Sequence, residues 1–383
     1  MNVLILGGDG YLGWPTAMFL SNLGHNVAVI DNYLRRSLAD ELALPNLSTT
    51  LDLEERVSLW GKTTGYEIKA FVGDCCDFEF LSDVVNRFQP DTIVHYAEQP
   101  SAPYSMIDHR AASLTLQNNL NGTLNLIWAV NKYSPDCHII KLGTMGEYGT
   151  PDIDIEEGWL NINHKGREDK FLYPRQGGSL YHTTKIQDTD LLWFYVRMWG
   201  LRVTDLMQGP VYGCFTDEIR MDERLNTFFS YDEIFGTVLN RFIVQAVCGY
   251  PLTIYGKGNQ IRGYLNLIDT INCIKLAAEN PAEKGELRIF NQFTETFSVN
   301  ELADKVIEAA GSIDLDVQKK SIQNPRNEKE EHYYNPAHTG LTSIGLLPKE
   351  LTNDVIIEML EYVIKHKENI IRDNIFKGIQ WKR

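Results

Sequence analysis

The stretch LILGGDGYLGWPTA, residues 4–17, decides the fold of this chain. It begins in an apolar run of strand length, and Gly7, Gly10 and Gly13 follow before a segment of helical character. Glycines at a strand-to-helix junction permit a tight turn and let backbone N–H groups approach a pyrophosphate, which the positive end of the helix dipole favours. The stretch therefore predicts a dinucleotide-binding loop in which these glycines and Tyr11 contact the cofactor.

Strand-length apolar runs recur along the chain, at residues 2–6, 26–31, 67–73, 91–96, 137–142 and 201–207. Longer segments of helical period lie between them, among them 109–133 and 180–199. This alternation predicts an α/β fold, a Rossmann-type doubly wound parallel sheet with helices on both faces. Residues 32–66 are too long for a tight strand-to-helix link, so we expect them to form an insertion.

After about residue 208 the strand–helix rhythm gives way to pieces punctuated by Gly and Pro, such as MQGPVYG and IQNPRNEKEEHYYNP. We expect residues 1–207 to form the dinucleotide-binding domain and residues 208–383 mainly a smaller C-terminal substrate-binding lobe, with the chain able to cross back to the first domain. Such a lobe would lie at the carboxyl edge of the sheet, where open α/β folds bind their ligands.

Composition excludes several classes of partner. The formal charge of −15 argues against nucleic acid or anionic lipid, which are bound by clustered Lys and Arg. No apolar run approaches the roughly 18 residues of a membrane span, and the first run lacks the basic flank of a signal sequence. The six cysteines lack the paired spacing of a zinc site or a disulfide framework. We therefore expect a cytoplasmic protein with reduced cysteines and no metal.

The residue at the end of the second strand indicates which dinucleotide binds. Asp31 follows Gly13 by 18 residues and can accept hydrogen bonds from the adenosine ribose, whereas its charge would repel a 2′-phosphate. NAD is therefore favoured over NADP. Arg35 and Arg36 favour the opposite, since a 2′-phosphate would attract them; they are either solvated loop charges or flank the adenosine.

Three further residues are expected near the adenosine. Asn32 follows the ribose acid directly, and the stretch GDCCD after the third strand supplies Asp74 and Cys75. For Asp74 an alternative is that it caps the next helix, because Asp is a favoured N-cap residue.

The stretch SLYHTTKIQ, residues 179–187, holds Tyr181 and Lys185 with the spacing YxxxK, which puts both side chains on one face of a helix. A nearby ammonium favours tyrosinate, so Lys185 is expected to lower the pKa of Tyr181 and make it a useful base. Thr144, at the end of the fifth strand, would then hydrogen-bond the same substrate hydroxyl. An isolated YxxxK is commonly a surface pair, but here it follows the glycine loop and the ribose acid in the expected order.

With these motifs the chain resembles the extended short-chain dehydrogenase/reductase superfamily of nucleotide-sugar enzymes over nearly its whole length. More narrowly, it is similar to the UDP-sulfoquinovose synthase family in the stretches GGDGYLGW, DNYLRR, SAPYSMID, KLGTMGEYGTPDIDIEEG, YGKGNQIRGYL, FNQFTETFSVNELA and NPRNEKEEHYYN. The resemblance implies NAD-dependent oxidation of UDP-glucose at carbon 4, elimination of water across carbons 5 and 6, addition of sulfite at carbon 6 and re-reduction at carbon 4. The product would be a sulfonated sugar donor for sulfolipid or sulfonated glycans.

By this resemblance Thr144, Tyr181 and Lys185 match the family's active-site triad, and His182 stands beside them. The triad also implies that Tyr181 and Lys185 contact the cofactor, and that Thr144 and His182 contact the substrate.

The elimination step needs acid–base groups of another origin than in related enzymes. Related 4,6-dehydratases place an Asp–Glu pair directly after the catalytic Thr, and this chain has Met145 and Gly146 there. Glu147 and His182 are the nearest titratable residues in sequence, so both are candidate acid–base groups. The alternatives are that Glu147 caps the following turn and that His182 packs on a helix face.

The resemblance also implies the residues that hold the substrate. The segment GKGNQIRGYL points to Arg262 as a ligand of the UDP phosphates, and NPRNEKEEHYY points to Arg326 as a second. Asn240 matches a position that holds a diphosphate or uracil group, and Gln208 stands where many relatives carry an Asn facing the sugar. Pro100 departs from the family, which carries a cation there, so a charge at this position has no part in sulfite binding here.

Other functions share these features. A UDP-sugar 4-epimerase or a 4,6-dehydratase would use the same glycine loop and triad, and a non-catalytic NAD-sensing scaffold would need the cofactor site alone. The intact Thr144, Tyr181 and Lys185 argue against the scaffold. The resemblance further implies UDP-glucose and sulfite as partners and a homodimer as the assembly.

Overall fold

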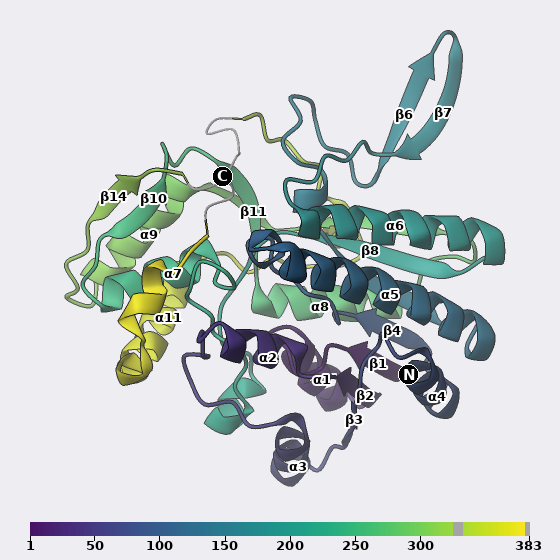
Figure 1. Ribbon diagram of the computed structural model, residues 1–383, viewed down its shortest axis with the longest axis horizontal. Helices are drawn as coiled ribbons and strands as arrows, with labels where there is room; N and C mark the ends of the chain where they lie inside the picture. The colour runs from purple at the N-terminus through teal and green to yellow at the C-terminus, as the bar shows by residue number, and fades with distance from the viewer. Residues whose placement is uncertain (325–331, 380–383) are drawn as a thin grey trace.

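The computed structural model describes residues 1–324 and 332–379, and a seven-stranded parallel sheet forms its centre (Figure 1). The strands lie in the order β12-β8-β5-β4-β1-β2-β3, so the chain winds outward in both directions from β1. This confirms the predicted doubly wound Rossmann-type sheet. In chain order the strands are β1 (Asn2–Leu6), β2 (Asn26–Asp31), β3 (Ile68–Val72), β4 (Thr92–His95), β5 (His138–Thr144), β8 (Arg202–Gln208) and β12 (Leu287–Gln292).

Helices cover both faces of the sheet, which is why its strands are continuous apolar runs. In β1, Leu4 and Leu6 face one core, and Val3 and Ile5 face the other. Side chains of α4 (Phe78–Phe88), α5 (His109–Tyr133) and α6 (Leu180–Trp199) fill the first core. Those of α1 (Gly13–Asn22), α3 (Leu53–Thr64) and α8 (Leu267–Glu279) fill the second.

The edge strand β12 comes from the part of the chain that the sequence assigned to the C-terminal lobe. It pairs in parallel register with β8, from Leu287 opposite Val203 to Gln292 opposite Gln208. The preceding helix α8 packs into the core on one face of the sheet. Residues 267–292 therefore complete the layer that the first 208 residues begin.

The second lobe has a core of its own, at the other end of the molecule in Figure 1. Its helices and strands are α7 (Val238–Val247), β10 (Leu252–Tyr255), β11 (Ile261–Asn266), β13 (Glu295–Ser298), α9 (Val299–Gly311), β14 (Lys319–Ile322) and α11 (Asn353–Lys365). The short strand β9 (Val211–Tyr212) pairs with β11, and the short helix α10 (Gly340–Ser343) lies against β12.

The predicted insertion, residues 32–66, connects the two lobes. It contains α2 (Leu34–Glu41) and α3, which begins at a capping box formed by Asp52 and Glu55. Trp60 of α3 is buried in the core beside α1, whereas Leu47 is buried in the core of the second lobe. The insertion is thus packed structure on both sides.

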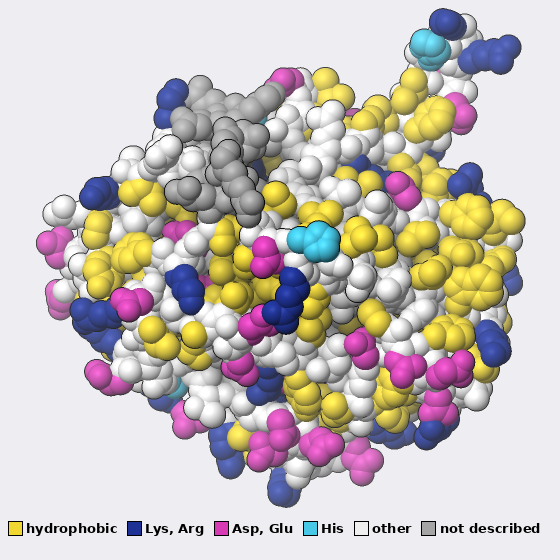
Figure 2. Space-filling model, viewed as in Figure 1, with side chains coloured by type: hydrophobic (Ala, Val, Ile, Leu, Met, Phe, Trp, Pro, Cys, Tyr) yellow, Lys and Arg dark blue, Asp and Glu magenta, His cyan; other side chains and the backbone are white. Residues whose placement is uncertain are grey.

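A two-stranded hairpin, β6 (Trp159–His164) and β7 (Arg167–Leu172), projects from the body of the protein (Figure 1). Its tip carries His164, Lys165 and Arg167, which are exposed. In the space-filling view basic side chains stand at the end of this arm (Figure 2). Within the described ranges, no helix combines the length and the apolar character that a membrane crossing requires.

We expect a chain truncated after Gln208 to lose cooperative folding, because β8 would become an unpaired apolar edge and the core beneath α8 would be open. Thermal unfolding followed by circular dichroism measures this. As a control, replacing residues 160–171 of the hairpin by a short Gly-Ser link should leave a cooperative transition. A single sharp transition in the truncated chain would contradict the expectation.

Candidate active site

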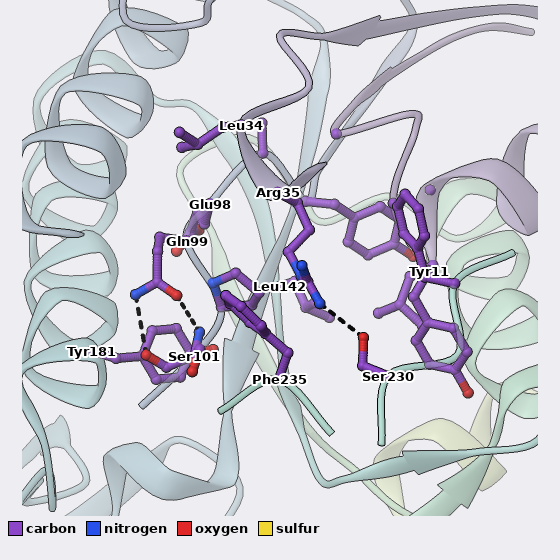
Figure 3. A pocket seen from close by; sticks show the side chains of 18 of the residues that line it. Tyr11, Leu34, Arg35, Glu98, Gln99, Ser101, Leu142, Tyr181, Ser230 and Phe235 are labelled. Atoms are coloured by element: carbon purple, nitrogen blue, oxygen red, sulfur yellow. Dashed lines mark hydrogen bonds between the residues drawn. The ribbon is translucent and has the colours of Figure 1, made fainter. Parts of the chain in front are cut away.

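A cavity of about 460 Å³ lies at the carboxyl ends of the parallel strands (Figure 3). The residues that follow the strands line it: Gly7 and Gly10 after β1, Asp31 and Asn32 at β2, Asp74 and Cys75 after β3, Glu98 and Gln99 after β4, Thr144 at β5, and Gln208 at β8. The second lobe closes the opposite side with residues 228–240. This is the crevice in which open α/β folds bind ligands.

The glycine loop has the shape that a pyrophosphate requires. Gly7 has φ of +88°, and a Cβ there would lie 2.8 Å from the carbonyl carbon of Tyr96. A Cβ on Gly13 would overlap the carbonyl oxygen of Gly7, so helix α1 can start this close to β1 only with glycine. At Gly10 a Cβ would meet only one atom, at 3.4 Å, which leaves its cavity side open to a ligand. The residues present therefore fit a dinucleotide.

The corner of the cavity beyond the glycine loop holds the predicted ribose acid. Asp31 Oδ2 accepts the N–H of Asp9 at 2.9 Å, and Oδ1 accepts the N–H of Tyr33 at 2.7 Å. Burial, and then the charge of Asp9, raise the pKa of Asp31 to about 6. Tyr11, predicted as a cofactor contact, also lines the cavity and donates its hydroxyl to Gly213 O at 2.6 Å.

Asn32, Asp74 and Cys75 line the same part of the cavity, where the sequence predicted them. Asp74 accepts the N–H of Cys76 at 2.8 Å, and Asp77 caps α4 instead. The alternative that Asp74 caps this helix is therefore wrong.

The two arginines after the ribose acid point to different partners. Arg35 lines the cavity, donates to Ser230 Oγ at 2.8 Å and stacks on Phe235 with 3.6 Å from its Cζ to the ring centroid (Figure 3). Arg36 lies behind the glycine loop and binds Asp9, with Nε 2.7 Å from Oδ2. Both guanidinium groups are held by protein partners, so neither is a solvated loop charge.

Three of the predicted catalytic residues lie on the wall of the cavity. Thr144, Tyr181 and His182 line it, from β5 and from the first turn of α6. Lys185 lies one turn further along α6 and is almost fully buried. The structure thus places three of these residues on the cavity wall and Lys185 beneath them, and their roles remain predictions.

Lys185 is bound by a carboxylate that the sequence analysis did not single out. Its Nζ donates to Glu98 Oε1 at 2.6 Å, and Oε2 of Glu98 is buried without a hydrogen-bond partner. Burial lowers the pKa of Lys185, but Glu98 and Asp188 outweigh it and raise this pKa. The only sequence signal for Glu98 is its place just after a strand, in HYAEQ.

The sequence predicted that Lys185 lowers the pKa of the Tyr181 phenol, and the structure does not agree. The pKa of Tyr181 is raised above its ordinary value, by burial first and then by Glu98 and Glu147. The expected lowering of this pKa is therefore wrong for the protein without cofactor, and Glu98, the partner of Lys185, is one of the groups that raise it.

A second buried ammonium lies beneath the triad. Lys141 on β5 donates to Thr189 Oγ1 at 2.8 Å and to the Lys185 carbonyl at 3.1 Å, and it lies 3.3 Å from both Glu147 Oε1 and Asp205 Oδ2. Burial lowers the pKa of Lys141, but Asp205 and Glu147 outweigh it, so the pKa is raised. This lysine lies in the apolar run CHIIKL, residues 137–142, and nothing in that sequence pattern indicated a function for it.

Glu147 lies outside the cavity and is fully buried. It forms a capping box with Thr144: Thr144 N–H donates to Glu147 Oε1 at 3.2 Å, and Gly146 N–H donates to Thr144 Oγ1 at 3.2 Å. Its other oxygen, Oε2, is 3.2 Å from Arg175 Nη1. The structure thus realises the capping alternative, and proton transfer by Glu147 stays a prediction.

His182 occupies the space that Gly146 leaves vacant. A Cβ on Gly146 would overlap Nε2 of His182, so a larger residue at position 146 and this imidazole position exclude one another. The other ring nitrogen, Nδ1, is 3.2 Å from Ser179 Oγ, the cap of α6. The imidazole therefore lies where a side chain from position 146 would otherwise project.

The predicted substrate ligands are divided. Gln208, which is paired with Thr144 across β5 and β8, and Asn240 both line the cavity, and so does Pro100. Arg262 does not; its Nη1 donates to Ile261 O at 2.8 Å and is 3.0 Å from His332 Nε2. Arg326 lies outside the described residues.

No group of three or more His, Cys, Asp or Glu side chains in residues 1–324 and 332–379 could hold a metal ion.

Comparison with known proteins gives three findings. The NAD dependent epimerase/dehydratase family model matches residues 3–291. The UDP-sulfoquinovose synthases of Spinacia oleracea (chloroplastic) and Sulfolobus acidocaldarius are 48% and 46% identical to this chain over 381 and 386 residues; the alignments cover 100% of this chain and 79% and 98% of those proteins. A UDP-glucose 4-epimerase from Bifidobacterium longum, solved in complex with NAD+ and UDP, has the same fold, with a TM-score of 0.72 at 19% identity over 97% of this chain and 100% of that chain.

We expect Gly13→Ala to prevent dinucleotide binding, because the new methyl group overlaps the Gly7 carbonyl oxygen and must move the loop. The matched control is Gly311→Ala, where no atom lies within 4 Å of the added carbon. The measurement is the NAD released from each purified protein on denaturation. A Gly13→Ala protein that carries as much NAD as the control would contradict the assignment of the loop.

Proposed function

We propose, from the premise that the chain belongs to the NAD dependent epimerase/dehydratase family, that it converts UDP-glucose and sulfite into UDP-sulfoquinovose and water. Support comes from the two relatives of that name, which align with the whole of this chain at 46% and 48% identity. The observation in the structure that carries the proposal is the imidazole of His182 in the place of a side chain at position 146.

NAD is the cofactor, and when bound it takes a hydride from carbon 4 of the sugar and later returns it. The loop of Gly7, Gly10 and Gly13 would hold its pyrophosphate by backbone N–H groups, and Asp31 would accept the adenosine ribose hydroxyls. Lys185, with Glu98 beside it, would hold the nicotinamide ribose of the cofactor close to Tyr181.

Tyr181 takes the proton of the carbon 4 hydroxyl while Thr144 hydrogen-bonds the same oxygen. The raised pKa of Tyr181 means that the phenol is neutral until a positive charge arrives. The oxidised nicotinamide of a bound cofactor would supply such a charge. Tyr181 would then act as a base in the presence of oxidised cofactor.

The later proton transfers belong to His182. Oxidation at carbon 4 acidifies the proton on carbon 5, and a base must remove it while an acid helps hydroxide leave carbon 6 as water. His182 is on the cavity wall beside Tyr181, with the ring centroids 5.3 Å apart. An imidazole suits both transfers because its ordinary pKa lies near neutrality. Sulfite then adds to carbon 6 of the resulting enone, and the hydride returns to carbon 4.

A 4-epimerase is the main alternative, because it would use the same triad and glycine loop. It needs no acid–base group beyond Tyr181, and His182 supports an elimination. A 4,6-dehydratase would also carry out an elimination, but it would add no sulfite, and its product would be a 6-deoxy-4-keto sugar. Asn240, Gln208, Arg262 and Arg326 are proposed to hold the UDP-sugar in each case.

We propose a homodimer formed through α5 and α6, which pack along one another. They carry an aromatic patch, defined as Trp128, Phe194, Tyr195, Met198 and Trp199, over which hydrophobic side chains gather in Figure 2. The exposed fraction is 46% for Trp128 and 61% for Met198. A second copy turned by a two-fold axis would present the same pair of helices and form a four-helix bundle.

We also propose that the protein acts in the cytoplasm. All six cysteines are free thiols, which suits a reducing compartment. The name of the spinach relative places that protein in the chloroplast.

The reaction is tested by incubating the protein with UDP-glucose and sulfite and measuring the nucleotide sugar by mass. Tyr181→Phe should abolish every step, including reduction of bound NAD. His182→Ala should keep NADH formation with UDP-glucose but slow solvent-deuterium uptake at carbon 5 and product formation by about 10²–10⁴-fold, the usual contribution of a general acid–base group.

Two further variants sharpen this test. Gly146→Ala should mimic His182→Ala, because its methyl group displaces the imidazole. Glu147→Gln should lower stability and all steps together if its role is capping, or slow deuterium uptake alone if it transfers protons. Conversion of UDP-glucose to UDP-galactose without consumption of sulfite would establish the epimerase instead.

For the dimer, we expect Trp128→Glu with Met198→Glu to give a monomer, because two carboxylates would be desolvated in the interface. Light scattering after gel filtration measures the mass. The control is Leu347→Glu, at a side chain that is 84% exposed and lies away from α5 and α6. A monomeric wild-type protein, or a dimer that survives the double substitution, would refute this interface.

A further inference from the structure

Two arginines lie next to the ribose acid of a protein that uses NAD. A 2′-phosphate would be bound by such arginines, since a guanidinium forms paired hydrogen bonds with a phosphate. Repulsion by Asp31 alone is the usual account of why NADP is rejected. The contacts of Arg36, and those of the more distant Arg56, give a second reason why NADP is rejected.

Arg36 makes four hydrogen bonds to protein acceptors. Its Nε and Nη2 donate to the two oxygens of Asp9, each at 2.7 Å, in a paired arrangement. Its Nη1 donates to Thr50 O at 3.0 Å, and Nη2 also donates to Leu51 O at 2.7 Å. The edge of the guanidinium that would grip a phosphate therefore grips the carboxylate of Asp9.

Arg56, on α3, also binds Asp9. It is completely buried, stacks 4.8 Å over the ring of Trp14, and its Nη2 donates to both the side chain and the carbonyl of Asp9. Nε and Nη1 of Arg56 have no hydrogen-bond partner. Asp9 is thus the carboxylate that forms an ion pair with this buried charge.

Asp9 itself stands at the corner of the cavity where a 2′-phosphate would project. It lines the cavity within the glycine loop, and its backbone N–H donates to Asp31 Oδ2 at 2.9 Å. The acid that holds the arginines is therefore adjacent to the acid that holds the ribose. A phosphate here would meet two carboxylates, and the guanidinium of Arg36 would already be bound to one of them.

We propose that Asp9 is a cofactor-specificity residue, which occupies Arg36 in place of a 2′-phosphate and so makes this arginine unable to recognise NADP. NAD selection then has two parts: Asp31 repels the phosphate, and Asp9 withholds the cation that would attract it. This inference concerns the cofactor alone and holds whichever nucleotide sugar is the substrate.

The proposal makes an unusual prediction about Asp31. Replacing the ribose acid by a small residue should not suffice for NADP binding, because Arg36 stays on Asp9. We expect Asp31→Ser to change the dissociation constant for NADP by less than about 10-fold. Adding Asp9→Ser with Arg56→Met should then tighten NADP binding by a further 10- to 100-fold or so, the range for charge-assisted hydrogen bonds from one guanidinium.

The combined substitution is chosen to keep the loop folded. Removing Asp9 alone would leave Arg56 buried without a counter-charge, which is strongly destabilising. Arg56→Met removes that charge and keeps most of the volume against Trp14, so the net charge of the cluster is unchanged. A milder version, Asp31→Ser with Asp9→Asn and Arg56→Met, also removes the buried charge but keeps an amide oxygen as an acceptor for Arg36, and should give a smaller gain in the same direction.

The measurement is calorimetric titration of cofactor-free protein with NAD and with NADP, together with the melting temperature of each variant. Adding Arg36→Met to the combined variant should abolish the gained NADP affinity and leave NAD affinity nearly as it was. Two results would overturn the proposal: Asp31→Ser alone binding NADP as tightly as the combined variant, or folded combined and Asn variants that bind NADP no better than Asp31→Ser.

Discussion

The ammonium of Lys141 is the point on which the geometry of the active site depends. It lies on β5 with no exposed surface, and its acceptors come from the turn after β5, from α6 and from β8. These are the elements that carry Thr144, Tyr181 and Gln208 into the cavity. An uncompensated charge at this depth would cost several kcal/mol, so the acceptors must stay in place around it. The relative positions of the strand ends and α6 are therefore fixed by groups that lie outside the cavity lining.

The cavity of this acidic protein binds an anionic cofactor with few unpaired cations. Among the described residues near it, Lys185 is paired with Glu98, and Arg36 is paired with Asp9. Attraction for phosphate must then come largely from backbone N–H groups of the glycine loop and from the helix dipole behind them. Pairing each cation with a carboxylate keeps the site selective, because a free ammonium or guanidinium would attract many anions. Arg35, held by a hydroxyl and an aromatic ring, is the exception on the cavity wall.

The sequence predicted those features that depend on local pattern. Six strands of the sheet were placed by their apolar runs, and α5 and α6 by their helical period, because strand alternation and helix period are local properties. β12 was missed as a sheet strand because its partner, β8, lies far away in the sequence. The sequence could place the other six strands, but only the tertiary fold shows that β12 forms the edge of the sheet next to β8.

The candidate site divides in the same way. Gly7, Gly13, Tyr181 and the ribose acid belong to motifs with fixed spacing, so the sequence could name them. Glu98 could not be named, because its importance arises from a contact with a residue 87 positions later. The same distance explains the error about the pKa of Tyr181: the spacing YxxxK reveals the ammonium but not the carboxylate that neutralises it. Likewise, only a folded chain shows that His182 fills the space above Gly146.

The return of β12 to the sheet has a consequence for how the chain is made. Roughly 80 residues separate the end of β8 from the start of β12. At about 5–20 residues per second, a ribosome needs several seconds to synthesise them. During that interval the other five strands of the sheet have been synthesised and can pair, but the edge of β8 that will bind β12 is unpaired. Nascent chains on neighbouring ribosomes could pair through that edge, so the cell's chaperones have a defined window in which this protein needs them.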